Sequence, residues 1–182
     1  SEFQSLYCEL DHRICSQGNA IHDLLRLAED SRLIESWDDR SITFRDEWSR
    51  DACRGFWLEE YAMQKLQKLH QSLHLQDFAK SIQFISPDGV RNELDAAFLY
   101  RNTLCILECK TCNTMEKGKG AEIIYKLDSL KALPGIFTKA AVLSFQDLES
   151  AEKKRAADRK LKTIIGPALS NLEKHLQQMV QM

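Results

Sequence analysis

The stretch Asn92–Thr111 reads NELDAAFLYRNTLCILECKT and decides the fold. It contains two mostly apolar runs, residues 94–100 and 103–109, with the polar pair Arg101-Asn102 between them. Apolar runs of this length on either side of a two-residue polar break are typical of a β-hairpin whose strands are largely buried. We therefore predict a buried hairpin around which the rest of the chain is arranged.

Charged residues meet at one end of this hairpin. Because side chains alternate along a strand, Glu108 and Lys110 share a face with Leu104 and Ile106. Asp95 opens the neighbouring strand and can reach the same end. Burying such charges costs several kcal/mol per ion unless a partner compensates them. Two explanations are open at this point: an internal salt bridge, or two carboxylates that bind Mg2+ or Mn2+ beside a lysine, which suits phosphodiester hydrolysis.

The rest of the pattern alternates helices and strands. A short strand is expected at residues 82–85, and buried strands are expected at residues 140–145 and 163–165. A last helix should begin at Gly166-Pro167, and its apolar stripe either closes the core or pairs with a partner chain. This order predicts a layered α/β fold with a central mixed sheet.

Four short motifs follow one another along the chain: Gly55–Tyr61 (GFWLEEY), Asn92–Asp95 (NELD), Glu108–Thr111 (ECKT) and Tyr125–Leu127 (YKL). In this order and spacing they resemble the C-terminal nuclease domain of the CRISPR-associated ancillary nucleases that carry a cyclic-oligoadenylate sensor at their N-terminus. Asp95, twelve intervening residues and then Glu108-Cys109-Lys110 look like the D…ExK signature of the wider PD-(D/E)xK, restriction-endonuclease-like superfamily. The resemblance covers about residues 41–166.

The resemblance implies a restriction-endonuclease-like α/β fold of three layers, with a central mixed β-sheet flanked by α-helices. It also implies a catalytic metal site in which Asp95, Glu108 and the backbone carbonyl of Cys109 coordinate Mg2+ or Mn2+. Lys110 would orient and polarise the attacking water or stabilise the charge that builds on the phosphate. Because a metal lowers the pKa of its bound water, such a site requires no histidine base.

A glutamate on the first helix of the fold is the next candidate. Apolar residues recur every three or four positions across residues 52–74 and predict a helix there. Glu59 lies at the border of the buried stripe of this helix, whereas Glu60 leads to its polar side. The superfamily places a first-helix glutamate at the metal site, so the resemblance gives that role to Glu59. A solvated acid favoured by the helix dipole is the alternative.

Lysines supply the candidate contacts to substrate. Lys117 and Lys119 lie in a polar stretch after the hairpin, which either touches phosphate or is only a solvated loop. Lys126 lies at the edge of an apolar helical stripe and either reaches the metal site or pairs with Glu122. The basic run at residues 153–162 is either a solvated helix face or a nucleic-acid contact.

A chain of 182 residues suits one medium domain with a small appendage. We expect residues 1–40 to be a linker and a small helical connector, with residues 1–3 a cloning remnant, and residues 41–182 to be the nuclease domain. The net charge of −2 gives no global basic footprint, so nucleic acid would have to bind a local patch.

The cysteines and the hydropathy pattern bear on location. Six cysteines in a mid-sized chain, no signal-peptide pattern and no run of about 18 apolar residues predict a cytoplasmic chain with free thiols and no membrane contact. Cys109 and Cys112 form a C-x-x-C motif, but no second pair is present to complete zinc ligation.

The resemblance implies an endonuclease that cleaves single-stranded DNA or RNA in antiviral defence. It further implies that cyclic tetra-adenylate activates the enzyme through a separate sensor domain, for which 182 residues leave no room. Relatives of this kind work as homodimers, and a homodimer here depends either on this chain or on the part of the protein that carries the sensor. Two alternatives stay open: a repair or restriction nuclease that acts on duplex DNA, and a catalytically idle nuclease fold that serves as a binding module.

Overall fold

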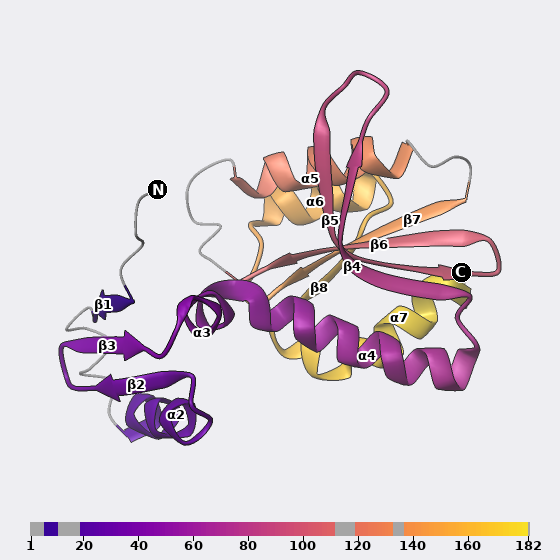
Figure 1. Ribbon diagram of the computed structural model, residues 1–182. Coiled ribbons are helices and arrows are strands. Elements are labelled where there is room, and N and C mark those ends of the chain that lie inside the picture. Colours follow the sequence, from indigo (N-terminus) through magenta and orange to yellow (C-terminus); the bar gives the residue numbers. More distant parts are fainter. Residues whose placement is uncertain (1–5, 11–18, 112–118, 133–136, 182) are drawn as a thin grey trace. The chain divides into compact units, whose positions relative to one another are not determined.

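The computed structural model describes residues 6–10, 19–111, 119–132 and 137–181, and the chain forms two compact units, Ser1–Trp57 and Leu58–Met182 (Figure 1). The N-terminal unit has a small core of Leu25, Ile34 and Phe44. Its three-stranded antiparallel sheet has the order β1-β3-β2. Its elements are β1 (Tyr7–Glu9), α2 (Asn19–Asp30), β2 (Ile34–Trp37), β3 (Ser41–Phe44), α3 (Glu47–Asp51) and the π-helical turn η1 (Ala52–Phe56).

The C-terminal unit is built on a five-stranded mixed sheet with the order β4-β5-β6-β7-β8. Strands β4, β5 and β6 are antiparallel neighbours, whereas β6, β7 and β8 run parallel. The elements of this unit are α4 (Trp57–Leu73), β4 (Asp77–Ile85), β5 (Arg91–Tyr100), β6 (Thr103–Lys110), α5 (Lys119–Ala132), β7 (Thr138–Ser144), α6 (Ser150–Asp158), β8 (Lys162–Ile165), the 3-10 turn η2 (Gly166–Asn171) and α7 (Leu172–Gln181).

Helices cover both faces of this sheet, as Figure 1 shows. Cys105 and Leu107 of β6 pack in one apolar cluster with residues of α4 and α7. Ile106, between them, packs in a second cluster with residues of α5 and α6. Because successive side chains of a strand point to opposite faces, β6 is buried on both sides. The predicted three-layer α/β fold with a central mixed sheet is confirmed.

The hairpin predicted from Asn92–Thr111 is also confirmed, as strands β5 and β6. Arg101 and Asn102 form its turn, and both take the left-handed backbone conformation, with φ of 47° and 60°. Two such residues in succession are what a tight two-residue hairpin turn requires. Gln76 holds the turn, because its side chain accepts a hydrogen bond from the Asn102 backbone N–H at 2.7 Å and donates one to the Asn102 side chain at 3.1 Å.

A kink in the sheet lies beside Asp95. The β4–β5 ladder pairs Lys80 with Ala96 and then Ile82 with Leu94, and leaves Ser81 and Asp95 between them unpaired. Ser81 has a left-handed backbone, with φ of 51°. The β5–β6 ladder also ends here, at Ala96 and its partner on β6. Asp95 therefore lies where β5 separates from β6, and beyond this point β4 and β5 continue as a projecting two-stranded arm (Figure 1).

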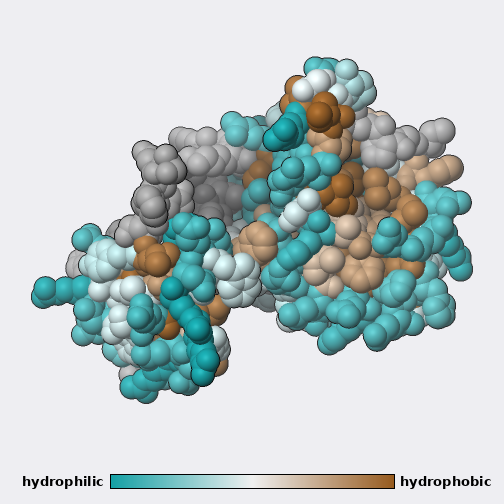
Figure 2. Space-filling view, in the orientation of Figure 1, coloured by the Kyte–Doolittle hydropathy of each residue, from teal (hydrophilic) through white to brown (hydrophobic). Residues whose placement is uncertain are grey.

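The projecting arm carries apolar side chains at its tip. Ile85 is 68% exposed and Val90 is 53% exposed, on either side of the turn that closes the arm. Figure 2 shows brown, hydrophobic surface at this tip. The turn itself follows the expected pattern, because the Gly89 N–H donates to the Ser86 carbonyl and Gly89 has φ of 81°. The arm thus extends from the kink that carries Asp95.

Two helices begin later than the sequence predicts. The helix expected over residues 52–74 starts at Trp57, because Gly55 interrupts it with φ of 174° and leaves a π-helical turn before it. Glycine weakens a helix interior, which explains the break. The last helix is preceded by the 3-10 turn η2, and α7 begins at Leu172. Its stripe is buried in the core of this unit at Leu172, Leu176 and Met179.

None of the helices in the described ranges is both long enough and apolar enough to cross a membrane. Cys8, Cys53, Cys105 and Cys109 are free thiols, as expected. Cys15 and Cys112 lie outside the described residues. The boundary expected at residue 41 stays a prediction; the structure pairs Ser41–Phe44 with β1 and β2 in the N-terminal unit.

Candidate active site

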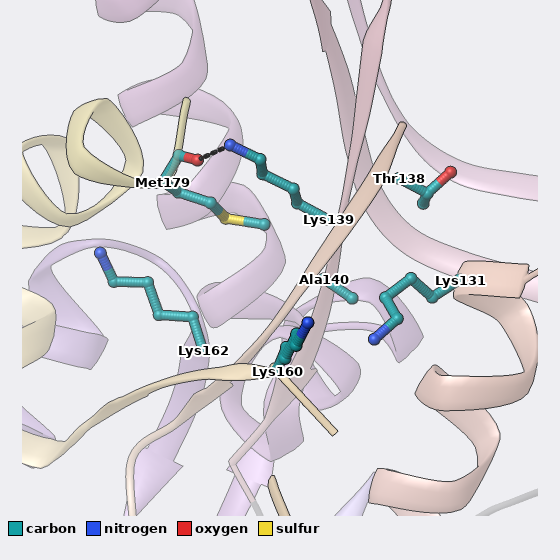
Figure 3. Close-up of a pocket in the computed structure, with 7 residues that line it drawn as sticks. All are labelled: Lys131, Thr138, Lys139, Ala140, Lys160, Lys162 and Met179. Atoms are coloured by element: carbon teal, nitrogen blue, oxygen red, sulfur yellow. Dashed lines mark hydrogen bonds between the residues drawn. The ribbon is translucent and has the colours of Figure 1, made fainter. Parts of the chain in front are cut away.

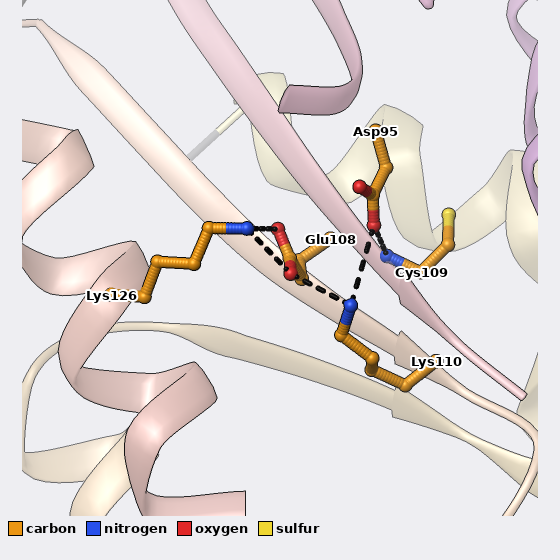
Figure 4. A network of polar contacts seen from close by, with 5 residues as sticks. All are labelled: Asp95, Glu108, Cys109, Lys110 and Lys126. Atoms are coloured by element: carbon orange, nitrogen blue, oxygen red, sulfur yellow. Dashed lines mark hydrogen bonds and ion pairs between the residues drawn. The ribbon is translucent and has the colours of Figure 1, made fainter. Parts of the chain in front are cut away.

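Glu108 is the most deeply buried charged group of the candidate site. It lies near the end of β6 with a side chain only 1% exposed. Its Oε1 is 2.9 Å from Nζ of Lys110 and 2.9 Å from Nζ of Lys126, and its Oε2 is 3.1 Å from the same Lys126 nitrogen (Figure 4). Two ammonium groups therefore compensate one buried carboxylate, which offsets much of the cost of removing it from water.

Asp95 approaches Glu108 from the kink in β5. Its Oδ2 accepts a hydrogen bond from the Cys109 backbone N–H at 2.6 Å and lies 3.9 Å from Nζ of Lys110. This bond gives the Cys109 N–H an acceptor at the point where the pairing of β5 with β6 has already ended. Burial, followed by the charge of Glu108, raises the pKa of Asp95 above its usual range. The two carboxylates are thus close enough to repel each other.

Lys110 lies between these two acids, as Figure 4 shows. Burial by itself would lower the pKa of its ammonium group. The charge and hydrogen bond of Glu108, followed by the charge of Asp95, outweigh burial and raise that pKa above its usual value. Lys110 therefore stays protonated at neutral pH and holds the acidic pair together.

Glu59 belongs to α4, which covers the face of the sheet opposite to α5. Burial, followed by the charges of Asp95 and Glu93, raises the pKa of Glu59 to about 6. Lys80 and Lys110 act in the opposite direction. Glu59 is thus within electrostatic reach of Asp95, from the side of α4. The neighbouring acid of the helix, Glu60, forms an ion pair with Lys80 instead.

The site offers two carboxylate ligands for a divalent cation, but no third ligating side chain beside them among the described residues. Among the described residues, no three His, Cys, Asp or Glu side chains form a group ready to hold a metal ion. Asp95 and Glu108 nevertheless offer a pair of mutually repelling carboxylates, with the backbone of Cys109 alongside. Hard oxygen donors of this kind fit Mg2+ or Mn2+, and a cation would relieve their repulsion.

The predicted substrate lysines have different outcomes. Lys126 reaches Glu108 from α5. Of its two expected positions, at the candidate metal site or paired with Glu122, the structure shows the first. Lys117 lies outside the described residues, and Lys119 is described only as the first residue of α5, without its side chain. The roles of both stay predictions.

Two residues of the basic run at residues 153–162 make local contacts. Lys153 Nζ lies 2.7 Å from Asp147 Oδ1. Arg159 lies over the Tyr125 ring at 4.6 Å, and its Nε is 3.3 Å from Asp128 Oδ2. Lys153 and Arg159 therefore face structural partners, and the nucleic-acid contact expected as one alternative for the rest of the run stays a prediction.

Comparison with known proteins places this geometry in context. The sequence model of the family described as "Card1-like, endonuclease domain" matches residues 46–182. The crystal structure of protein VC1899 from Vibrio cholerae is similar, with 30% identity and a TM-score of 0.80, over 96% of this chain and 46% of that protein. Can2 from Sulfobacillus thermosulfidooxidans, solved in complex with cyclic tetra-adenylate, shares 28% identity with a TM-score of 0.79, over 97% of this chain and 48% of Can2. The chain thus spans about half the length of these two proteins. No curated protein sequence matched.

Proposed function

Because the chain belongs to the Card1-like endonuclease domains, CRISPR-associated nucleases of restriction-endonuclease-like fold, we propose that it hydrolyses phosphodiester bonds in single-stranded DNA or RNA with the help of Mg2+ or Mn2+. The observation that carries this proposal is the cluster of Asp95, Glu108 and Lys110 at the point where β5 separates from β6. A catalytically idle fold would have no need to keep two repelling carboxylates beside a half-buried lysine.

The carboxylates of Asp95 and Glu108 and the carbonyl of Cys109 would hold the ion, and Glu59 would support it or hold a second one. When bound, the metal would make its water more acidic and polarise the phosphate. The hydrogen bond from the Cys109 N–H fixes the orientation of the Asp95 carboxylate, so the ligand does not have to be ordered when the ion arrives.

Lysines supply the positive charge that phosphodiester cleavage requires. Lys110 remains protonated between two acids, so its ammonium group can donate a hydrogen bond to the attacking water or to a phosphate oxygen. Lys126 approaches from α5, on the other side of Glu108, and is partly exposed. We expect it to bind the phosphate on the side of α5.

Regulation by cyclic tetra-adenylate is proposed from the likeness to Can2. Can2 was solved in complex with this cyclic nucleotide, and this chain covers 48% of Can2. We infer that a sensor region like the remaining part of Can2 binds the nucleotide, and that such a region would control the site of this chain. Antiviral defence, and action as a homodimer, are proposed on the same basis.

The test is cleavage of labelled single-stranded DNA, single-stranded RNA and duplex DNA, each with Mn2+, Mg2+ or EDTA. Cutting of a single strand that requires metal and falls at least about a hundredfold in Glu108→Gln and Lys110→Met supports the proposal. Lys153→Met is the matched control, because Lys153 pairs with Asp147 and not with an acid of the candidate site. Preference for the duplex would instead favour the repair or restriction alternative.

Calorimetric titration with Mn2+ distinguishes a nuclease that lacks its activator from a nuclease fold without catalytic activity. Binding that is lost in Glu108→Gln means that the metal site exists even if the chain does not cut by itself. Absence of any binding would contradict the metal-dependent mechanism.

A further inference from the structure

A lysine-lined cavity of about 400 Å³ opens at the start of strands β7 and β8 (Figure 3). Its lysines come from separate elements, at the end of α5, on β7, after α6 and at the start of β8. No acidic residue is among the residues that line it, which are Lys131, Thr138, Lys139, Ala140, Lys160, Lys162 and Met179. Figure 3 shows the ammonium groups of Lys139 and Lys162 on the α7 side of β7 and those of Lys131 and Lys160 on its other side. Four lysines without an acid among the lining residues make the local potential positive.

Most of these ammonium groups form hydrogen bonds that do not neutralise their charge. Lys139 Nζ donates to the Met179 carbonyl at 2.8 Å, and Lys162 Nζ donates to the His175 carbonyl at 2.7 Å. A carbonyl oxygen satisfies an ammonium group without cancelling its charge. Within the described part of the chain, only Lys131 has an acid nearby, with Nζ 3.4 Å from Asp128 Oδ1. The cavity therefore keeps an excess of positive charge.

Lys160 is the lysine with most freedom to bind a ligand. It is exposed, and its ammonium group makes no hydrogen bond or ion pair with any residue that the structure describes. The other three lysines all donate to carbonyl groups of helix α7 or of Arg159, the residue after α6. The bonds to Arg159 and Met179 have a structural explanation, because basic side chains stabilise the carboxyl ends of helices. Lys160 has no such explanation.

The positive charge of these lysines also affects His175 of α7. Burial, followed by the charges of Lys162 and Lys174, lowers the pKa of His175 below its usual value. The imidazole of His175 therefore favours its neutral form.

The position of the cavity relates it to the active site. In the parallel pairing of β6 with β7, Lys139 is opposite Cys105, and Val142 is opposite Glu108. Three residues of strand separate these two levels, which is about 10 Å. Lys139 is on the face that packs against α7, whereas Glu108 is on the face that meets α5. The cavity and the active site are therefore separate places, and an anion that occupies both must be a long polyanion.

We propose that this cavity binds phosphate groups of the single-stranded nucleic acid at a distance from the cleavage site. The choice of nucleic acid rests on the proposed function. The cavity would hold the strand through its backbone, and would therefore add affinity without sequence preference.

Binding of a fluorescein-labelled strand of about 12 nucleotides, measured in EDTA at roughly 50 mM salt, tests the proposal without any cutting. Lys160→Glu should weaken binding about tenfold, and Lys160→Ala should lower the dependence of log Kd on log salt by about 0.7, the value of one contact to a single strand. Lys154→Glu is the control, because Lys154 is also exposed and does not line the cavity. Equal binding by the Lys160 variants and the native chain would overturn the proposal, as would no binding by the native chain.

Methyl NMR of Met179 reports on the cavity directly, since this residue lines it. The strand should shift the Met179 methyl signal in the native chain and not in Lys160→Glu. If inorganic pyrophosphate shifts the signal and the strand does not, the ligand is a free anion and the proposal fails. Cleavage with Mn2+ is scored separately: loss of cutting while the strand still binds contradicts the proposed function and not the cavity.

Discussion

At the scale of single residues, the site depends on how one buried carboxylate is neutralised. The alternation of side chains along β6 predicted that Glu108 and Lys110 would project together, and the structure pairs them at 2.9 Å. The contact with Lys126 was only one of two options in the sequence, because it joins a helix to a strand 18 residues away. Local periodicity shows which face of a helix is buried, but not which side chain of another element it meets.

Lys126→Met separates the structural role of this lysine from its proposed catalytic one. The free energy of unfolding should fall by about 1–2 kcal/mol, because Glu108 loses two charge-assisted hydrogen bonds. The affinity for Mn2+ should rise roughly three- to tenfold, because a positive charge beside the proposed ligand is removed. Urea unfolding and Mn2+ calorimetry measure the two effects. Lys154→Met, on an exposed lysine, should change neither, and a fall in Mn2+ affinity in Lys126→Met would contradict the expected repulsion.

Thiol chemistry gives a pH-dependent prediction at the same scale. Burial raises the pKa of Cys105 to about 12. At pH 8 its thiolate fraction is therefore roughly one in ten thousand, and it grows about tenfold with each pH unit. Burial also raises the pKa of Cys53, but this residue is exposed, so it should react with iodoacetamide before Cys105, which should react only after the chain is unfolded. Peptide mass mapping of labelled and unlabelled cysteines checks the order; rapid labelling of folded Cys105 would mean that β6 is accessible.

At the scale of elements, the hairpin could be predicted and its kink could not. Two apolar runs around Arg101-Asn102 are a strong local signal, and strands β5 and β6 follow it closely. Ser81 gives no such signal, because serine does not ordinarily indicate a left-handed backbone. The kink arises where one ladder ends and another continues, and this depends on long-range pairing. The position of Asp95 was therefore expected only in outline.

Substitution at Ser81 should disturb Asp95 through this kink. Ser81→Val should lower the free energy of unfolding by about 1–3 kcal/mol, because a β-branched residue tolerates φ of 51° poorly. The strand should then straighten and weaken the hydrogen bond from the Cys109 N–H to Asp95, which moves the Cys109 amide proton signal upfield. Ser81→Gly should keep both stability and signal, since glycine adopts this backbone freely.

Ala79→Val is the matched control for this experiment, because Ala79 is an exposed residue of the same strand that pairs regularly with Ala97. It should leave the Cys109 signal in place. If Ser81→Val behaves like Ala79→Val, the kink does not position Asp95.

At the scale of the whole molecule, the order of elements indicated the fold class, whereas the sequence pointed to the lysine cavity only through the basic run at residues 153–162, without Lys131 and Lys139. The charged residues of the cavity come from three stretches, each of which reads as part of an ordinary helix or strand. Only the packing of α5, α6 and α7 around β7 and β8 brings them together. Sites assembled from separate elements are thus harder to predict than a site such as Glu108 and Lys110, whose residues lie on one strand.

The independence of the C-terminal unit is the last prediction. Its two apolar clusters contain only residues from Leu58 onward, whereas the cluster of the N-terminal unit draws on residues 8–44. A chain of residues 46–182, the range of the family match, should therefore fold alone and unfold cooperatively, with a melting temperature within about 5 °C of the C-terminal transition in the full chain. Calorimetry and near-ultraviolet circular dichroism measure this. Leu66→Ala in the shortened chain is the reference for a damaged core, since Leu66 is fully buried. If the shortened chain unfolds without a cooperative transition, the two units depend on each other for stability.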